Sequence, residues 1–295
     1  LQNQYVLYRK SRETQEEIFL DPNTFSEDGT TSLSSLSFSK SGNLVAYSIS
    51  EGGSDWRKII VLDAIKNKIL EDTLVDVKFS GIQWKKEEGF FYSSYDKPKG
   101  SELSEMTNQH KLYFHKLGTS QAEDDLIFGG TEEEKHRYVG ANVTEEGDFL
   151  IISASKTTSG NISFLKNLNQ EDSPLLPMDT DYDTDSYLLD NVGDIFFIVT
   201  NKEAPNQKVV KANAKNPQDV HWVDFIPETE NVLSVTSGGG YFFARYMIDA
   251  NSQVVQYNLK GENQGIVKLP GMGTASGWSG KKEQQTLYYS FTNYH

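Results

Sequence analysis

Cysteine is absent from the 295-residue sequence, which excludes disulfide bonds and thiolate metal sites. Proline is scarce at eight residues, and no proline-rich or serine-rich run interrupts the chain, so no disordered linker is expected inside it. No apolar run approaches the roughly 20 residues that span a bilayer, so no membrane partner is expected. The lack of cysteine fits a reducing compartment, which favours the cytoplasm, while a bacterial periplasm stays open. The chain begins at Leu1 without an initiator methionine or a signal peptide, and we expect it to be part of a longer protein.

Basic residues are outnumbered, with 28 lysines and arginines against 42 aspartates and glutamates, for a formal net charge of −14. Nucleic acid is therefore not an expected partner, because binding to phosphates needs clustered lysine and arginine. The simplest role of the negative charge is solubility, and the alternative is an acidic channel or rim that biases which peptides enter.

A β-hairpin is the first structure that the sequence predicts. A run with alternating apolar residues at 36–39 meets the turn Lys40-Ser41-Gly42-Asn43, and a second apolar run follows at 44–49. Glycine and asparagine reach positive φ with little strain, which is what a tight turn between two strands needs. The same arrangement recurs with turn glycines about 40 to 58 residues apart, the range of propeller blades and other repeat arrays. Because almost no helical pattern is present, this period predicts an all-β fold, a β-propeller of four-stranded antiparallel blades.

The expected strands fill five blades and begin two more. The five blades comprise 36–39, 44–50, 58–63 and 68–70; 82–84, 90–95, 111–116 and 125–128; 138–143, 149–154, 162–166 and 174–176; 187–189, 195–200, 208–212 and 221–225; and 232–235, 241–246, 253–259 and 265–269. An incomplete first blade holds 5–9 and 17–20, and an incomplete last blade holds 275–278 and 287–291. Together they predict a seven-bladed β-propeller, with first and last blades incomplete, as a single domain over residues 1–295.

No catalytic constellation can be recognised in the sequence. The nucleophile motif G-x-S-x-G is missing, and Gly277-Trp278-Ser279-Gly280 is one residue short of it and falls in an expected turn. The five histidines lack the close spacing of metal ligands. The alternating aspartates of 179–185 are suited to Ca²⁺, but Thr184 stands where the EF-hand turn needs glycine, so a solvated loop is favoured. We therefore expect no catalytic residue, no metal site and no cofactor in this segment.

Stretches along the whole chain resemble one known family in the same order. They are 1–8, 19–23, 26–30, 38–47 and 291–292 and, most specifically, Gly53-Ser54-Asp55-Trp56 and 110–119. These stretches resemble the N-terminal β-propeller of the prolyl oligopeptidase family. The resemblance implies a propeller that is not closed by an interlocking strand and is inserted into an α/β-hydrolase serine peptidase that cleaves short peptides after proline.

The resemblance also implies how such a chain works. The catalytic serine, aspartate and histidine of the family lie in the hydrolase domain, which is absent from this chain, so the propeller is expected to be inactive alone. It caps the active site and admits only peptides small enough to enter. The implied partners are the α/β-hydrolase domain of the same parent chain and short proline-containing peptides.

Two groups of residues take roles from this resemblance. In the family a Thr-Asn-Arg run reaches the substrate cavity; this sequence has Thr200-Asn201-Lys202, so Asn201 and Lys202 are expected to bind substrate. Lysine keeps the charge of arginine but lacks its planar fork, and an ordinary lysine at a hairpin end is the alternative. The loop Lys156-Thr157-Thr158-Ser159-Gly160 resembles the mobile interdomain loop of the family, and its composition suits mobility. The loop 96–110 is long for a compact repeat, which favours a functional role.

Two other functions stay open from the sequence. If the native reading frame ends at His295, the chain is a stand-alone propeller whose rim loops bind a protein partner. The second alternative is the propeller of a related oligopeptidase with a different specificity, because the pocket for the residue before the cut is built mainly outside this segment.

Overall fold

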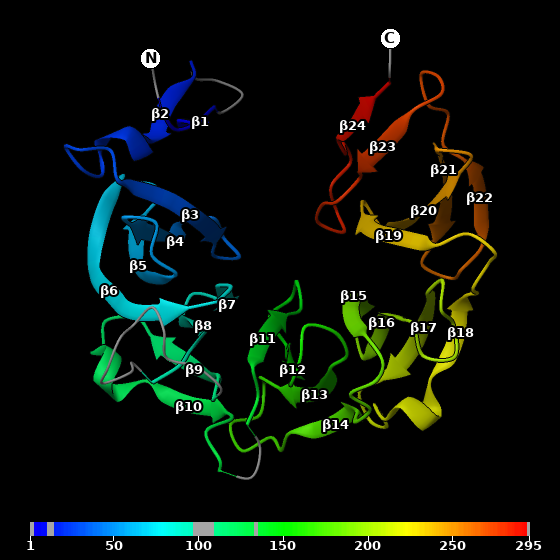
Figure 1. The fold of residues 1–295 in the computed structure, drawn as a ribbon, viewed down its shortest axis with the longest axis horizontal. Coiled ribbons are helices and arrows are strands. Elements are labelled where there is room, and N and C mark those ends of the chain that lie inside the picture. The colour runs from blue at the N-terminus through cyan, green and yellow to red at the C-terminus, as the bar shows by residue number, and fades with distance from the viewer. Residues whose placement is uncertain (1–2, 11–14, 97–108, 133–134, 294–295) are drawn as a thin grey trace. The chain divides into compact units, whose positions relative to one another are not determined.

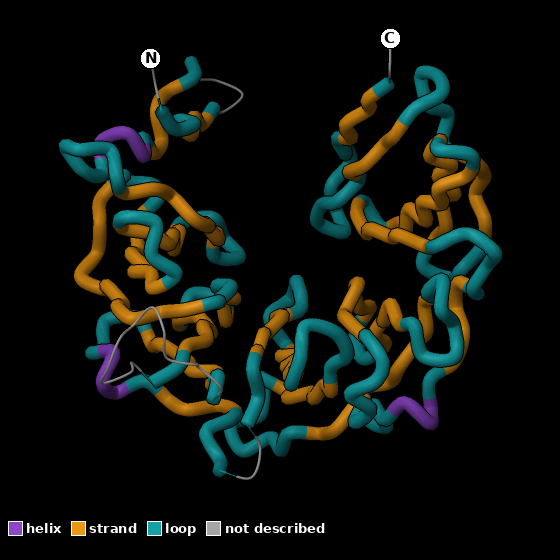
Figure 2. The backbone as a smooth tube through the Cα atoms, in the orientation of Figure 1, coloured by secondary structure: helices purple, strands orange, loops and turns teal. Residues whose placement is uncertain are grey.

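The computed structural model describes residues 3–10, 15–96, 109–132 and 135–293. Its chain divides into two compact units, Leu1–Thr157 and Thr158–His295. Strands and their connecting loops make up almost all of the described chain, with three short 3₁₀ turns and no α-helix among the described residues (Figure 2). None of the helical turns in the described part has the length and apolar character that crossing a membrane requires.

The first unit contains two four-stranded antiparallel sheets and two hairpins (Figure 1). One sheet has the order β3-β4-β5-β6, and the other has the order β10-β9-β8-β7. The hairpins are β1 with β2 and β11 with β12. The strands are β1 (Leu7–Arg9), β2 (Glu17–Leu20), β3 (Thr31–Phe38), β4 (Leu44–Glu51), β5 (Trp56–Asp63), β6 (Lys68–Lys78), β7 (Gln83–Lys85), β8 (Gly89–Ser94), β9 (Lys111–Lys116), β10 (Asp125–Phe128), β11 (Tyr138–Val143) and β12 (Phe149–Ser155), with 3₁₀ turns η1 (Pro22–Thr24) and η2 (Gln121–Glu123).

The second unit repeats this plan with the sheets β15-β16-β17-β18 and β19-β20-β21-β22 and the strand pairs β13–β14 and β23–β24 (Figure 1). Its strands are β13 (Ile162–Asn167), β14 (Leu176–Asp179), β15 (Ser186–Val192), β16 (Ile195–Thr200), β17 (Lys208–Asn213), β18 (Val223–Ile226), β19 (Leu233–Gly238), β20 (Tyr241–Ile248), β21 (Asn251–Asn258), β22 (Asn263–Ile266), β23 (Thr274–Gly277) and β24 (Tyr289–Thr292), with the 3₁₀ turn η3 (Asp219–His221). The boundary between the units falls in the expected third blade, between β12 and β13.

The hairpin turns form as the sequence predicts. Gly42 has a φ of +77°, and its N–H donates to Ser39 O at 2.9 Å, which closes the turn between β3 and β4. The hydroxyl of Ser41 accepts from Asn43 N at 3.0 Å and fixes the loop from inside. Residues on β4 are then buried almost without alternation, as expected for an inner strand that is covered on both faces.

Each unit buries its own apolar core between neighbouring sheets. In the first unit, Ile59, Leu74 and Phe90 pack together with other buried apolar residues of β4 to β8. In the second unit, Phe197 of β16 packs against Phe242 of β20 with ring centroids 4.7 Å apart, and this contact joins the two four-stranded sheets of that unit. Burial of these large side chains contributes about 2–3 kcal/mol each, so packing between sheets is the main stabilising term.

Several strand boundaries differ from the expected ones. The strand expected at 68–70 continues to Lys78, because bulges in its pairing with β5 break the alternation that a sequence pattern depends on. Outer strands expected at 174–176 and 265–269 are shifted to Leu176–Asp179 and Asn263–Ile266, where few side chains are buried and the apolar pattern carries little register information. The predicted start of one outer strand at 221 is occupied by η3 instead.

Candidate functional site

The Thr200-Asn201-Lys202 run lies directly after β16 and forms a turn. The Thr200 hydroxyl accepts from Lys202 N at 3.1 Å, and Asn201 O accepts from Ala204 N at 3.0 Å. Thr200 is buried at the strand end, so the next two side chains emerge from a rigid position.

Lys202 is the centre of a group of carboxylates, which we call the Lys202 cluster and define as Lys202, Asp179, Asp181 and Asp219. The Lys202 Nζ lies 3.3 Å from Asp179 Oδ1 and 4.0 Å from Asp181 Oδ2, and it donates a short hydrogen bond to Asp219 Oδ2. The Lys202 side chain is 28 % exposed. Partial burial alone would lower the pKa of Lys202, but the hydrogen bonds and negative charge of Asp219 and Asp179 raise it. The ammonium is therefore charged at neutral pH and remains accessible at one side.

The expectation of a solvated loop at 179–185 is wrong for its first residue. Asp179 is the last residue of β14 and its side chain is fully buried. It accepts from Asp181 N at 3.1 Å and from the Thr184 hydroxyl at 3.3 Å, besides its contact with Lys202. A buried carboxylate needs such compensation, so this aspartate is a structural counter-ion to Lys202. No group of three or more potential metal ligands occurs in the described part of the chain.

The loop Lys156-Thr157-Thr158-Ser159-Gly160 joins the two compact units, whose boundary falls between Thr157 and Thr158. Its first four residues are exposed, while Gly160 is buried. Gly160 has a φ of +74°, and its N–H donates to Asp185 Oδ1 at 2.8 Å. A Cβ at this position would lie 1.7 Å from Tyr182 O, so the close backbone approach requires glycine.

Asp185 connects the two groups of residues that the sequence singles out. Its carboxylate accepts from Gly160 N and, at 3.3 Å, from Asn201 Nδ2. In return, Asn201 Oδ1 accepts from Asp185 N at 2.7 Å. Asn201 thus lies inside a polar anchor, and the neighbouring Lys202 carries the exposed charge. The sequence singled out Asn201, Lys202 and Gly160 but not the aspartate that links them.

The first unit contains a second charged group that the sequence does not reveal, the His115 cluster, made of His115, Asp72, Asp124 and Tyr92. The His115 Nδ1 lies 2.7 Å from Asp124 Oδ1, and its Nε2 lies 3.3 Å from Asp72 Oδ1. The Tyr92 hydroxyl donates to Asp124 Oδ2 at 2.7 Å. The imidazole is 1 % exposed. Because Asp72 lies 43 residues from His115, no local motif could have predicted the cluster.

Both ring nitrogens of His115 face carboxylate oxygens, which accept hydrogen bonds and cannot donate them when ionised. Burial alone would lower the pKa of His115, but the hydrogen bond and charge of Asp124, followed by those of Asp72, raise it. The cluster therefore favours the imidazolium. Burial and the contact with Asp124 also raise the pKa of Tyr92, which stays a neutral donor.

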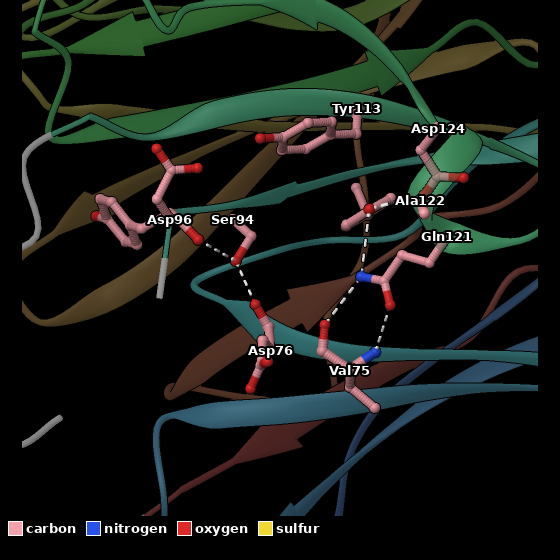
Figure 3. A pocket seen from close by; sticks show the side chains of 10 residues that line it. Val75, Asp76, Ser94, Asp96, Tyr113, Gln121, Ala122 and Asp124 are labelled. Carbon is pink, nitrogen blue, oxygen red and sulfur yellow. Dashed lines mark hydrogen bonds between the residues drawn. The ribbon is translucent and has the colours of Figure 1, made fainter. Parts of the chain in front are cut away.

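A cavity of about 460 Å³ lies beside this cluster, with Tyr92, Asp124 and Tyr113 among its lining residues (Figure 3). The Gln121 side chain crosses to β6, where its Nε2 donates to Val75 O and its Oε1 accepts from Val75 N, both at 2.9 Å (Figure 3). The Ser94 hydroxyl donates to Asp76 O at 2.5 Å on the same wall (Figure 3). The cavity walls are thus held by specific hydrogen bonds between strands. The central part of the long loop 96–110, residues 97–108, lies outside the described residues.

These antiparallel four-stranded sheets, with a two-stranded first pair and a two-stranded last pair, define the class as a β-propeller domain. The family model for the N-terminal β-propeller domain of prolyl oligopeptidase matches residues 1–295. The chain belongs to the prolyl oligopeptidase family. This finding confirms the family resemblance and the predicted propeller fold class.

Relatives and solved structures agree with this assignment. The chain is 54 % identical over 295 residues to the prolyl endopeptidase of Elizabethkingia meningoseptica, and the match covers all of this chain and 42 % of that protein. A prolyl endopeptidase structure, from a study of inter-domain dynamics in catalysis and specificity, matches with a TM-score of 0.88 at 32 % identity, over 99 % of this chain and 42 % of that one. Prolyl oligopeptidase B of Galerina marginata, solved with a 35-residue hydrolysis and macrocyclization substrate, gives a TM-score of 0.88 at 26 % identity, over 98 % of this chain and 44 % of that one. The chain therefore spans about two fifths of the length of these proteins.

Proposed function

We propose that this chain is the propeller of a serine-type prolyl endopeptidase that cleaves short peptides after proline. The observation that carries the proposal is the 54 % identity to a prolyl endopeptidase over the entire chain. In this proposal, residues 1–295 form one functional domain without catalytic residues. The catalytic serine, aspartate and histidine belong to an α/β-hydrolase domain of the same parent protein, which is the principal partner of the propeller.

The proposed role of the propeller is to cap the active site and restrict entry to small peptides. Four-stranded sheets with apolar cores between them make stiff walls, and stiff walls suit size exclusion. A cap of this kind also keeps water and bulky substrates from the reacting groups, which is a general function of lids and caps. The chemistry of bond cleavage is left to the partner domain.

Within this role, Asn201 and Lys202 are the proposed substrate-binding residues and 156–160 the proposed gating loop. The Lys202 ammonium has three donors, and its close contacts are Asp219 and Asp179, with Asp181 at 4.0 Å. A peptide carbonyl or carboxylate then takes the third donor or replaces the partly exposed Asp181. This favours one hydrogen bond to the substrate rather than the paired bonds that an arginine would make.

A hybrid enzyme tests the proposed function. This chain replaces the matching stretch of the Elizabethkingia meningoseptica prolyl endopeptidase, and three samples are compared: the hybrid, the isolated chain and the unmodified enzyme. We expect the hybrid to cleave a short chromogenic proline peptide, and the isolated chain to leave it intact.

Size restriction is measured with the same scissile sequence placed in an exposed loop of a folded protein. We expect the hybrid to cleave the short peptide and spare the folded protein. A hybrid that has native circular dichroism and cuts neither substrate would overturn the endopeptidase assignment. Equal cleavage of both substrates would remove the gating role, and cleavage by the isolated chain would show that the catalytic residues lie within it.

A further inference from the structure

The start of β15 is clasped from two sides by asparagine side chains. Asn161 Oδ1 accepts from Ser186 N at 3.0 Å, while Asn161 Nδ2 donates to Ser186 O at 3.0 Å. One residue earlier, Asn201 Oδ1 accepts from Asp185 N, and Asn201 N donates to Asp185 O at 3.2 Å. Each asparagine satisfies backbone groups that would otherwise be left unpaired where the ladder begins. The two segments that supply them, 160–161 and 200–202, are the ones that border the proposed gating loop and Lys202.

Strand register explains why the Lys202 turn reaches this point. Ser186 pairs with Thr200 in the ladder between β15 and β16, so the residue before β15 and the residue after β16 are neighbours. Asp185 and Asn201 are those two residues. Their mutual hydrogen bonds extend the ladder by one step beyond the strands.

The carboxylate of Asp185 adds a connection that the backbone alone does not make. One oxygen accepts from Gly160 N and the other from Asn201 Nδ2, so a single side chain bridges the end of the loop and the turn. The contact with Gly160 is held in place by the close passage of Gly160 against Tyr182 O, which leaves no room for a side chain. The loop therefore ends at a fixed point, and its exposed residues 156–159 extend from that point.

We infer that Asp185 is a positioning residue that holds the end of the 156–160 loop and the Asn201–Lys202 turn in one fixed arrangement. The assignment of these two segments to substrate entry and binding rests on the proposed function, whereas the anchoring itself does not. Asp185 has no role in bond cleavage, because its oxygens are committed to Gly160 and Asn201. It acts through these two partners, and removing it frees both segments together.

Hydrogen exchange and proteolysis on the 295-residue chain test the anchor without any need for catalysis. Asp185→Ala removes both acceptors, and the matched control Asp183→Ala removes an exposed carboxylate from the same loop. Loss of a hydrogen bond to a charged acceptor should speed exchange of the Gly160 amide by about tenfold or more. Trypsin cleavage after the exposed Lys156 should accelerate in the same variant. The control should leave both rates unchanged.

A second variant keeps the test valid if Asp185→Ala fails to fold. Asp185→Asn preserves shape and an oxygen for Gly160, but it directs an amide NH₂ towards Asn201 Nδ2, so two donors face each other. We expect faster exchange at Gly160 than in Asp183→Asn, by a smaller factor than in the alanine variant. Equal Gly160 exchange rates in the Asp185 and Asp183 variants would overturn the anchor.

The hybrid enzyme then tests whether the anchor matters for substrate. If the anchored segments bind peptide, Asp185→Asn should raise KM several-fold and leave kcat nearly unchanged, and the Asp183→Asn hybrid should match the unsubstituted hybrid. An unchanged KM together with faster Gly160 exchange would overturn the link to substrate binding. A wild-type hybrid without activity would instead reject the proposed function, and the exchange result would still decide the anchor.

Discussion

Each compact unit surrounds one cation with aspartates, and the two arrangements differ in their access to solvent. The imidazole of the His115 cluster is 1 % exposed, and its partners Asp72 and Asp124 are 6 % and 2 % exposed. The ammonium of the Lys202 cluster is 28 % exposed, and Asp219 is 22 % exposed. A sealed ion pair contributes to stability only while both partners are present, whereas an open one can exchange a carboxylate for a ligand. The comparison assigns the His115 cluster to the scaffold and the Lys202 cluster to recognition.

The largest expected effect comes from removing a carboxylate of the sealed cluster. Asp124→Ala leaves the His115 imidazolium with one carboxylate and the Tyr92 hydroxyl without its acceptor. Breaking a buried ion pair in this way should lower the free energy of unfolding by about 3–5 kcal/mol. Urea titration measures the loss, and the exposed neighbour Asp125→Ala is the matched control. Equal stability of the two variants would show that the cluster is not a structural element.

His110, at the other end of β9, should give the next largest effect, in acid. Its Nε2 contacts Lys78 O at 2.9 Å, and its Nδ1 accepts from Val139 N at 2.7 Å, so the neutral ring joins β6 to β11. Burial lowers the pKa of His110 from 6.5 to about 4. The unfolded chain then takes up a proton first as pH falls below 6.5, and stability on the order of 3 kcal/mol is lost between pH 6.5 and pH 4. His110→Gln should remove this slope from urea titrations across that range, and a slope that persists unchanged would contradict the account.

His115 should act in the opposite direction. Its folded-state pKa is raised above the ordinary 6.5, so its contribution is fully present below pH 6.5 and is lost as pH rises through the folded-state value. The difference in unfolding free energy between wild type and His115→Gln should therefore shrink with rising pH. The same difference for His110→Gln should shrink with falling pH. Slopes of the same sign for the two histidines would show that one of them is wrongly assigned.

The smallest effect is expected in the open cluster. Asp219→Ala removes one partner of Lys202, but the ammonium is partly exposed and keeps Asp179. Exposed ion pairs contribute little, so the unfolding free energy should fall by less than about 1 kcal/mol. Urea titration beside Asp124→Ala measures this contrast directly. A loss as large as that of Asp124→Ala would mean that the Lys202 cluster is also part of the scaffold.

Much of the fold could be predicted from the sequence because the hairpins are local. The strands at 17–20 and 111–116 begin and end where the apolar alternation predicts, and turn glycines such as Gly42 mark where the chain reverses. Outer strands could not be placed as well. In β6, aspartates and bulges interrupt the pattern, and only the pairing with β5 shows that the strand continues to Lys78.

The candidate site could be predicted only in part, for a related reason. Asn201, Lys202 and Gly160 lie in short runs that can be recognised without knowledge of the fold. Asp185 gains its role from the register of β15 against β16, and the His115 cluster joins residues far apart in the sequence. The buried state of Asp179 likewise depends on Lys202, 23 residues later. Contacts of this kind are set by topology, which one sequence does not state.

The separation of scaffold from recognition is tested most directly by substrate kinetics of two matched hybrid variants. Lys202→Gln removes the charge of the open cluster but keeps hydrogen-bond donors for its aspartates, and His115→Gln does the same for the sealed cluster. KM and kcat are measured with a short proline peptide at a temperature where both variants remain folded. We predict that Lys202→Gln raises KM several-fold at unchanged thermal stability, while His115→Gln lowers the melting temperature and leaves KM unchanged. An unchanged KM for Lys202→Gln, or a raised KM for His115→Gln alone, would contradict the account.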